Sequence, residues 1–229
     1  MKLYYDLHIH SDLSPCADKE MTPNNIVNMA YIKGLNIISV TDHNTAGNIQ
    51  VIKQLGNNLG IEVIPGLEVT TREEVHVLCY FNNLAAAEEF GTLIYESLPD
   101  IKNNPLIFGE QNLYNCEDEI IGQLDKLLLN ASKYSLDEIY RLVKKYKGIT
   151  VPAHINKKSN GILGILGFMP LNLAIDFIEI FQKTEVDESL IKKYYILKNS
   201  DAHKLSDISE PVNSFELDTI AGIYDFLKL

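Results

Sequence analysis

Short apolar runs alternate with amphipathic segments along most of the chain. Residues 3–9 begin the pattern, with aromatic, β-branched and Leu residues interleaved with polar ones as in a half-buried strand. Thr22 can cap the helix that follows, which we expect to end near Gly34. Further strands are expected at residues 36–41, 61–64, 75–81, 149–154, 175–181, 196–200 and 212–217. Further helices are expected at residues 46–59, 84–97, 135–147, 187–195 and 219–229. This order predicts an α/β domain with a mostly parallel sheet.

The alternation fails between Asn82 and Tyr134. After the helix at 84–97, we expect a loop at 99–115 and a second helix from there to about Asn130. An excursion of this length is either structural packing or a lid over a site, and the sequence leaves both interpretations open. Since no repeat, low-complexity tract or domain boundary is visible, we expect a single domain over residues 1–229.

The six histidines all occur within or directly after strand-like runs. His8 and His10 are two residues apart in a strand, so they project from one face. The others in the same context are His43, His76, His154 and His203. Asp201 and His203 repeat the two-residue spacing. Functional residues of closed α/β barrels gather at the C-terminal ends of several strands, and imidazole suits Zn, Mn or Fe. The distribution therefore predicts one polynuclear metal site.

Five segments carry a resemblance to a known family. They are DLHIHS at residues 6–11, ISVTDHN at 38–44, PGLEVT at 65–70, PAH at 152–154 and NSDAH at 199–203. Together, and in this order, they resemble the motifs of the polymerase and histidinol phosphatase (PHP) family of metal-dependent phosphoesterases. The resemblance implies a distorted (β/α)7 TIM-like barrel of the PHP type, with a trinuclear metal site at the C-terminal ends of its strands.

The same resemblance implies which residues bind the metals. The implied ligands are His8, His10, Glu68 and Asp201 for one ion, Glu68, His76 and His154 for a second, and His43, His203 and Asp18 for a third. Glu68, whose carboxylate would bridge two ions, has a catalytic role together with Asp201 and His203. The mixed imidazole and carboxylate set favours two to three divalent transition metals, either Mn, Zn or Fe, over Mg or Ca.

Asp18 is the one expected ligand at which the chain departs from the family pattern. In related sequences the loop after the first two histidines supplies a His or Asp at shorter spacing, whereas here Asp12, Cys16 and Asp18 are the candidates. We prefer Asp18 because Pro15 should bend the loop back before it.

Three cations are candidates for binding a substrate phosphate. Arg72 follows Glu68 by four residues, and Lys157 and Lys158 soon follow His154. Ordinary solvated surface is the alternative for all three.

These residues predict a phosphoric ester hydrolase. Two neighbouring metals would activate a shared water as hydroxide for in-line attack on phosphorus, so no nucleophilic Ser or Cys is required. We expect a small phosphorylated metabolite or nucleotide as substrate. The alternatives are a nuclease or 5′-end trimming enzyme acting on short nucleic acid, and a catalytically silent binding or regulatory module.

Net charge and cysteine content refine the expected partners and location. The formal net charge is −11, which argues against a long nucleic acid as partner and favours a small substrate. Three well-separated cysteines are expected to be free thiols in a reducing compartment. The first strand begins at once, leaving no room for a signal peptide, and no apolar run reaches membrane-spanning length. We therefore expect a cytoplasmic protein that does not bind membranes.

Overall fold

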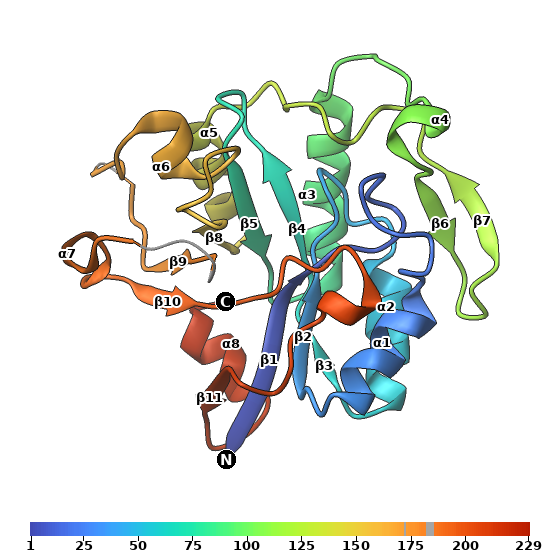
Figure 1. The fold of residues 1–229 in the computed structure, drawn as a ribbon, viewed down its shortest axis with the longest axis horizontal. Helices are drawn as coiled ribbons and strands as arrows, with labels where there is room; N and C mark the ends of the chain where they lie inside the picture. The colour runs from blue at the N-terminus through green and yellow to red at the C-terminus, as the bar shows by residue number, and fades with distance from the viewer. Residues whose placement is uncertain (172, 182–185) are drawn as a thin grey trace.

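The structure is a computed structural model that describes residues 1–171, 173–181 and 186–229 (Figure 1). Its first sheet has the order β11-β1-β2-β3. The members of that sheet are β1 (Lys2–Ile9), β2 (Ile37–Val40), β3 (Glu62–Val63) and β11 (Ser214–Glu216). Strands β1, β2 and β3 are parallel, as predicted, and β11 pairs antiparallel with β1.

Two helices pack beside this sheet (Figure 1). Helix α1 (Pro23–Ile32) begins where predicted, because the Thr22 side chain accepts a hydrogen bond from the Asn25 N–H and Pro23 occupies its first turn. Helix α2 (Ile49–Asn58) packs against α1 and β3. The predicted caps and end residues therefore describe this half of the domain well.

The second sheet differs from the prediction of mostly parallel strands. Strands β4 (Gly66–Thr70), β5 (His76–Tyr80) and β8 (Ile149–Pro152) pair antiparallel throughout. The cause is a short turn over residues 71–75, in which Glu74 has a φ of 64° and donates its N–H to Thr71, so β5 folds straight back on β4. As a result His76, the first residue of β5, pairs with Thr70, the last residue of β4.

A third pair of strands, β9 (Phe177–Glu179) and β10 (Tyr195–Leu197), is parallel. Single bridges join neighbouring sheets, one between Ile9 and Ala202 and one between His43 and Glu68. Over the described ranges the strands form several small sheets and no continuous closed ladder. The α/β class is thus confirmed, and the closed barrel is not.

The excursion at residues 82–134 contains more sheet than predicted. Helix α3 (Leu84–Ser97) is present as expected, and a short α4 (Pro105–Phe108) follows it. The second predicted helix is wrong, because β6 (Asn112–Tyr114) and β7 (Ile120–Gln123) form a hairpin there. The reason is Asn115, whose side chain accepts the N–H groups of Glu117 and Glu119 and so closes a turn.

Buried polar side chains connect this hairpin to the loop after β1 and to the N-terminus of α2. The Asp12 carboxylate accepts hydrogen bonds from Asn112 Nδ2 at 2.6 Å and from the Tyr114 hydroxyl at 2.5 Å. Asn48 donates to the Asn112 carbonyl and accepts from the Tyr114 N–H. In Figure 1 the hairpin lies on the opposite side of the molecule from β9 and β10.

Asn44 connects the excursion to the ends of two strands. Its side-chain nitrogen donates to the carbonyls of Leu128 and Asn130, and its side-chain oxygen accepts the Thr70 N–H. Its own N–H donates to the Glu68 carbonyl at 2.7 Å. Asn tolerates the left-handed conformation that this position requires, with a φ of 55°.

The remaining helices complete the domain. They are α5 (Leu136–Lys145), α6 (Ile162–Leu166), α7 (Glu188–Ile191), α8 (Gly222–Leu227) and the 3-10 helix η1 (Leu205–Asp207). The capping box of Ser135 and Glu138 is present as predicted, whereas α6 was not predicted. In the described part of the chain, no helix is both long enough and apolar enough to cross a bilayer. Cys16, Cys79 and Cys116 are free, as predicted.

Candidate metal centre

The predicted metal ligands other than Asp18 lie together at one edge of the sheets. They come from β1 and the residue after it (His8, His10), the segment after β2 (His43), β4 (Glu68), the start of β5 (His76), the segment after β8 (His154) and the segment after β10 (Asp201, His203). Because β5 runs antiparallel to β4, its beginning lies at the same edge as the end of β4. The structure thus brings these side chains together, although His76 begins a strand and does not end one.

Glu68 lies at the centre of this cluster and is fully buried. Its Oε1 is 3.0 Å from His76 Nδ1, 3.3 Å from His154 Nε2 and 3.4 Å from His8 Nε2. Its Oε2 is 3.0 Å from His43 Nδ1 and 3.4 Å from His10 Nε2. Burial opposes ionisation, but the charges of His76, His8 and His43 hold the pKa of Glu68 well below its usual range. The carboxylate is therefore ionised and faces five imidazoles.

Asp201 is another carboxylate of the cluster. Its Oδ1 lies 3.3 Å from Nε2 of both His8 and His10. Its Oδ2 pairs with the ammonium of Lys157. Burial raises the pKa of Asp201, but His8 and His10 outweigh this effect and lower it below its usual range.

A second buried carboxylate, Glu179 at the end of β9, was not singled out from the sequence. Both of its oxygens lie 3.0 Å from His8 Nδ1, and it also accepts hydrogen bonds from Asn199 Nδ2 and the His154 N–H. A carboxylate on Nδ1 turns Nε2 of the same ring toward the cluster. The available signal was a Glu at the end of a buried apolar strand, in Phe177-Ile178-Glu179.

Asp42 and Asp6 support the site indirectly. Asp42 accepts hydrogen bonds from the hydroxyls of Ser11 and Ser14, and Ser14 Oγ lies 3.0 Å from His10 Nδ1. Burial raises the pKa of Asp42 to about 6. Asp6 accepts the Ser200 and Ser209 N–H groups, so it fixes the segment that carries Asp201.

The donor atoms form three groups that could each hold a metal ion. Within each group the atoms lie within 4.8 Å of one another, and the groups are His8, His10 and Asp201; His43, Glu68 and His76; and His10, His43 and His203. Neither oxygen of Glu68 accepts a hydrogen bond within the described chain, although both are buried. A buried anion without hydrogen bonds needs a cation, and imidazole with carboxylate suits a divalent transition metal. The residues therefore fit the implied metals.

The structure does not bring Asp18 or Asp12 into these groups. Asp18 is exposed, and its carboxylate accepts the Glu20 N–H. Asp12 is occupied by Asn112 and Tyr114. Cys16 is exposed and also belongs to none of the three groups, although its thiol is near enough to the imidazoles of His203 and His43 to interact with them. Desolvation raises the pKa of this thiol, but the two imidazoles lower it, and the result is about 6.

Of the three predicted phosphate-binding cations, only Lys157 lies at the cluster. It lines a cavity of about 160 Å³ together with His43, Glu68, His76, His154 and Asp201, among others. The Arg72 side chain is 62% exposed and points toward Glu138, with 3.9 Å between Nη1 and Oε2. Lys158 is exposed and does not line this cavity.

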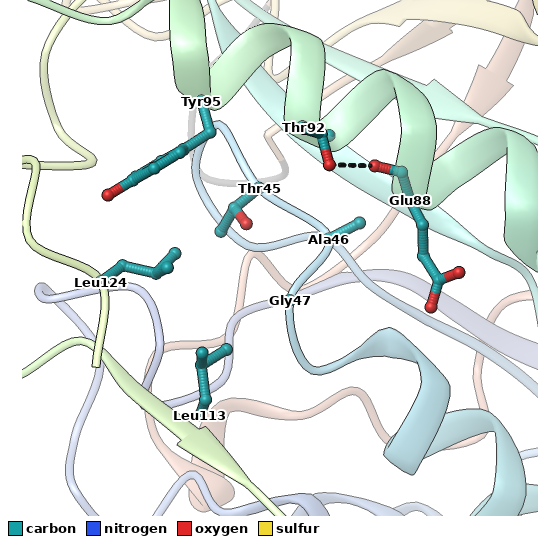
Figure 2. Close-up of a pocket in the computed structure, with 9 residues that line it drawn as sticks. Thr45, Ala46, Gly47, Glu88, Thr92, Tyr95, Leu113 and Leu124 are labelled. Atoms are coloured by element: carbon teal, nitrogen blue, oxygen red, sulfur yellow. Dashed lines mark hydrogen bonds between the residues drawn. The ribbon is translucent and has the colours of Figure 1, made fainter. Parts of the chain in front are cut away.

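A neighbouring cavity of about 260 Å³ is not part of the metal cluster (Figure 2). It lies between residues 45–47 and α3, with Leu113 and Leu124 on its other side. Its lining contains one carboxylate, Glu88, and no imidazole. The cavity marks where the excursion meets the segment after His43.

The sequence profile of the PHP domain matches residues 6–221. This chain belongs to the PHP family. The match confirms the resemblance seen in the five motifs and, at the level of the family, the prediction of a metal-dependent phosphoric ester hydrolase.

Several known proteins are similar to this PHP chain. A 5′-3′ exoribonuclease of Haemophilus influenzae is 35% identical over 77 residues, which are 32% of this chain and 27% of the relative. The lesion-specific endonuclease PfuEndoQ of Pyrococcus furiosus has a TM-score of 0.68 at 22% identity, over 96% of this chain and 54% of that one. A proposed metal-dependent phosphoesterase of Bifidobacterium adolescentis has a TM-score of 0.65 at 16% identity, over 97% and 96% of the two chains. The chain thus spans about half the length of the endonuclease and aligns with about a quarter of the exoribonuclease.

The expectation that a long nucleic acid is an improbable partner is wrong. A structure of Endonuclease Q with a 27-mer duplex shares this fold, with a TM-score of 0.63 at 21% identity over 90% of this chain and 50% of that one. The exoribonuclease relative also acts on nucleic acid by its name. The inference failed because net charge describes the whole surface, whereas bound cations set the local charge of a metal site.

Proposed function

We propose that this chain is a metal-dependent phosphoesterase that hydrolyses a phosphate ester of a nucleotide or another phosphorylated metabolite. Glu68 carries the proposal, because its two buried oxygens face five imidazoles within 3.4 Å and accept no hydrogen bond from the described residues. Such a carboxylate is suited to bridging two cations. We further propose two to three ions, and a distorted barrel whose neighbouring sheets are linked by the Ile9–Ala202 and His43–Glu68 bridges.

Divalent ions at these ligands would supply an activated water and would neutralise charge on the phosphoryl oxygens. The residues of the chain position the metal ligands and the phosphate-binding group. Glu179 holds the His8 ring so that Nε2 faces the cluster. Lys157 places its ammonium at the cavity. There it can leave the ion pair with Asp201 and bind a phosphate oxygen of the substrate.

Names of relatives support phosphate esters of nucleotides as the first substrates to test. They include the exoribonuclease and a phosphoribosyl 1,2-cyclic phosphate 1,2-diphosphodiesterase of Eggerthella lenta. Both act on esters in which phosphate is attached to a ribose. We therefore propose a sugar phosphate ester as the common chemical unit.

The test combines metal content with turnover. The protein is purified without chelator, its metals are measured, and it is stripped and reconstituted with Mn, Zn or Fe(II). The panel contains nucleoside 5′-monophosphates, 5′-phosphorylated oligonucleotides and bis(p-nitrophenyl) phosphate. We expect at least two metal equivalents and metal-dependent release of product from at least one class. Less than one equivalent in every reconstitution, or no turnover of any substrate, would reject the proposal.

A further inference from the structure

A cavity of about 810 Å³ lies along α5, at the beginnings of β8 and β9. Its lining includes Ile149 and Phe177, the first residues of these two strands. The metal-cluster residue His154 follows the other end of β8, and Glu179 is at the other end of β9. At about 3.3 Å per residue, the length of β8 alone separates the cavity from the metal edge by roughly 10 Å. The cavity is therefore a separate place in the fold, and none of the three metal-capable groups lines it.

The charge at this cavity is opposite to that of the whole chain. Its lining contains four cationic and two anionic side chains, which are Arg141, Lys144, Lys147, Lys228, Asp137 and Asp176. Positive charges thus outnumber negative ones here, although the chain has a net charge of −11. Asp137 pairs with Arg141, and Asp176 pairs with Lys228. Within the described residues Lys144 and Lys147 form no ion pair, so two ammonium groups are available to an anion.

Two of these lysines have a left-handed backbone, with a φ of 57° at Lys147 and 64° at Lys228. They follow the ends of α5 and α8. Gly is common at this position because the conformation is unfavourable for residues with a side chain, and Gly34, Gly60 and Gly167 take it after α1, α2 and α6. The chain therefore accepts a less favourable backbone at two helix ends where a lysine lines the cavity, and such strain is typical of functional sites.

The backbone around Lys147 is closely packed. The Lys147 N–H donates to the Lys144 carbonyl at 3.1 Å, and the Gly148 N–H donates to the Val143 carbonyl at 3.0 Å. Gly148 has no room for a side chain, because a Cβ there would lie 2.6 Å from the Tyr80 carbonyl oxygen. Lys147 is thus held beside Lys144, and one anion can contact both ammonium groups.

The uncharged part of the lining combines apolar and hydrogen-bonding groups. Ile149, Leu173 and Phe177 supply apolar surface, and Asn82 and Thr150 supply an amide and a hydroxyl. Apolar surface suits the face of an aromatic base, and the amide and hydroxyl suit the polar edge of its ring. The volume is within the range of small-molecule sites and exceeds what a lone phosphate needs.

We propose that this cavity binds a nucleoside phosphate, with the base against the apolar surface and the phosphate at Lys144 and Lys147. The ligand is bound here without being hydrolysed, because the metal-capable groups lie at the other ends of the strands. The inference goes beyond the proposed function and does not depend on it.

Hydrogen exchange of the metal-loaded full chain locates the ligand. The probe is adenosine 5′-(α,β-methylene)diphosphate, in which a carbon bridge between the phosphorus atoms resists hydrolysis. We expect the probe to slow exchange of the backbone amides at residues 141–150 and 173–177. Unchanged exchange in both segments at millimolar probe would overturn the proposal.

Three single variants separate ligand binding from support of the helix end. Lys144→Ala and Lys147→Gly each remove one ammonium group, and Lys145→Ala removes an exposed charge in the same turn that does not line the cavity. The probe concentration for half-maximal protection should rise about tenfold in the first two variants and stay unchanged in the third. Lys147→Gly should also raise the melting temperature, because Gly adopts the left-handed backbone readily. Equal affinity in all three variants would mean that the lysines serve the helix end alone, and would overturn the proposal.

Inorganic pyrophosphate and metal removal complete the test. Pyrophosphate lacks the base, so its protection of residues 141–150 should require a concentration about tenfold higher or more. Equal potency would overturn the nucleoside phosphate as ligand. Removal of the metals with a chelator should abolish turnover and leave protection by the nucleotide probe in place. Protection that disappears with the metals would overturn the separate site, whereas absence of turnover at every metal loading would overturn only the proposed function.

Discussion

Two regions of the molecule are built from buried polar side chains but differ in hydrogen bonding. One is the metal edge, the cluster of imidazoles around Glu68, and the other is the attachment, where Asp12 contacts the hairpin of residues 112–123. At the attachment, the Asp12 carboxylate has two donors, Asn112 and Tyr114. At the metal edge, both oxygens of Glu68 are buried without a hydrogen bond from the described residues and face imidazoles. Since burying an unsatisfied polar group costs stability, the second arrangement is expected only where function requires it. Substitutions at the metal edge should therefore change metal binding and turnover, and substitutions at the attachment should change stability.

The largest effect is expected for Glu68→Gln. The amide keeps the size of the side chain but loses the negative charge shared by two ions. We expect kcat/KM to fall by about a thousandfold, equivalent to the several kcal/mol that metal-ion catalysis supplies, with loss of about one metal equivalent. Glu89→Gln, on the exposed face of α3, is the matched control. Activity equal to the control, measured at equal folded fraction by circular dichroism, would mean that Glu68 is a structural residue.

Glu179→Gln should have the next largest effect. The amide oxygen of Gln can still accept the His8 Nδ1–H, but the variant loses the negative charge and one of the two acceptor oxygens, so the support of the ring is weakened. Loss of such a supporting partner weakens metal affinity or activity by roughly 10 to 100-fold. Competition titration with a chelating dye measures the affinity, and Glu216→Gln, at an exposed position of β11, serves as control. A variant with native affinity but a lower melting temperature would place Glu179 with the structural carboxylates.

Asp12→Ala should act on stability alone. It leaves the Tyr114 hydroxyl and Asn112 Nδ2 buried without an acceptor. We expect a loss of about 2 kcal/mol in the free energy of unfolding, measured by urea denaturation, with unchanged metal content. If the variant instead loses a metal equivalent, Asp12 belongs among the ligands and the contrast between the two regions fails.

The smallest effect is expected for Lys157→Ala compared with Lys158→Ala. Lys157 lines the cavity and pairs with Asp201, whereas its neighbour is exposed outside it. Removing one charge-assisted contact to phosphate should raise KM by about tenfold, with metal content unchanged. Steady-state kinetics on both variants measures the difference. Equal KM values in the two variants would mean that Lys157 does not contact the substrate phosphate.

The sequence predicted which side chains gather at one site better than the topology that brings them together. His8, His10 and Asp201 follow from strand periodicity and the motif order, and the start of α1 follows from Thr22. The position of His76 is different. It begins β5, and it lies beside the end of β4 only because the two strands pair antiparallel. Such pairing depends on a short turn whose direction a hydrophobic pattern does not specify.

Two further misses have local physical causes. Strand β6 was predicted as part of a loop and β7 as part of a helix, whereas the Asn115 side chain in fact closes a turn between them. Glu179 was missed because a single carboxylate at a strand end gives no spacing pattern, and its partner His8 lies 171 residues away. Both depend on contacts that the sequence does not display.

Asn44 also has a consequence for how the native protein opens. The Asn44 side chain donates to the carbonyls of Leu128 and Asn130 and accepts the Thr70 N–H, and Asn44 directly follows His43 of the metal cluster. Segments joined in this way tend to lose protection from hydrogen exchange as one unit. The backbone amides of the Leu128–Asn130 stretch and of β4 should therefore exchange with similar opening free energies. Metal binding at the cluster should slow hydrogen exchange in both segments, including residues 128–130, which contribute no ligand.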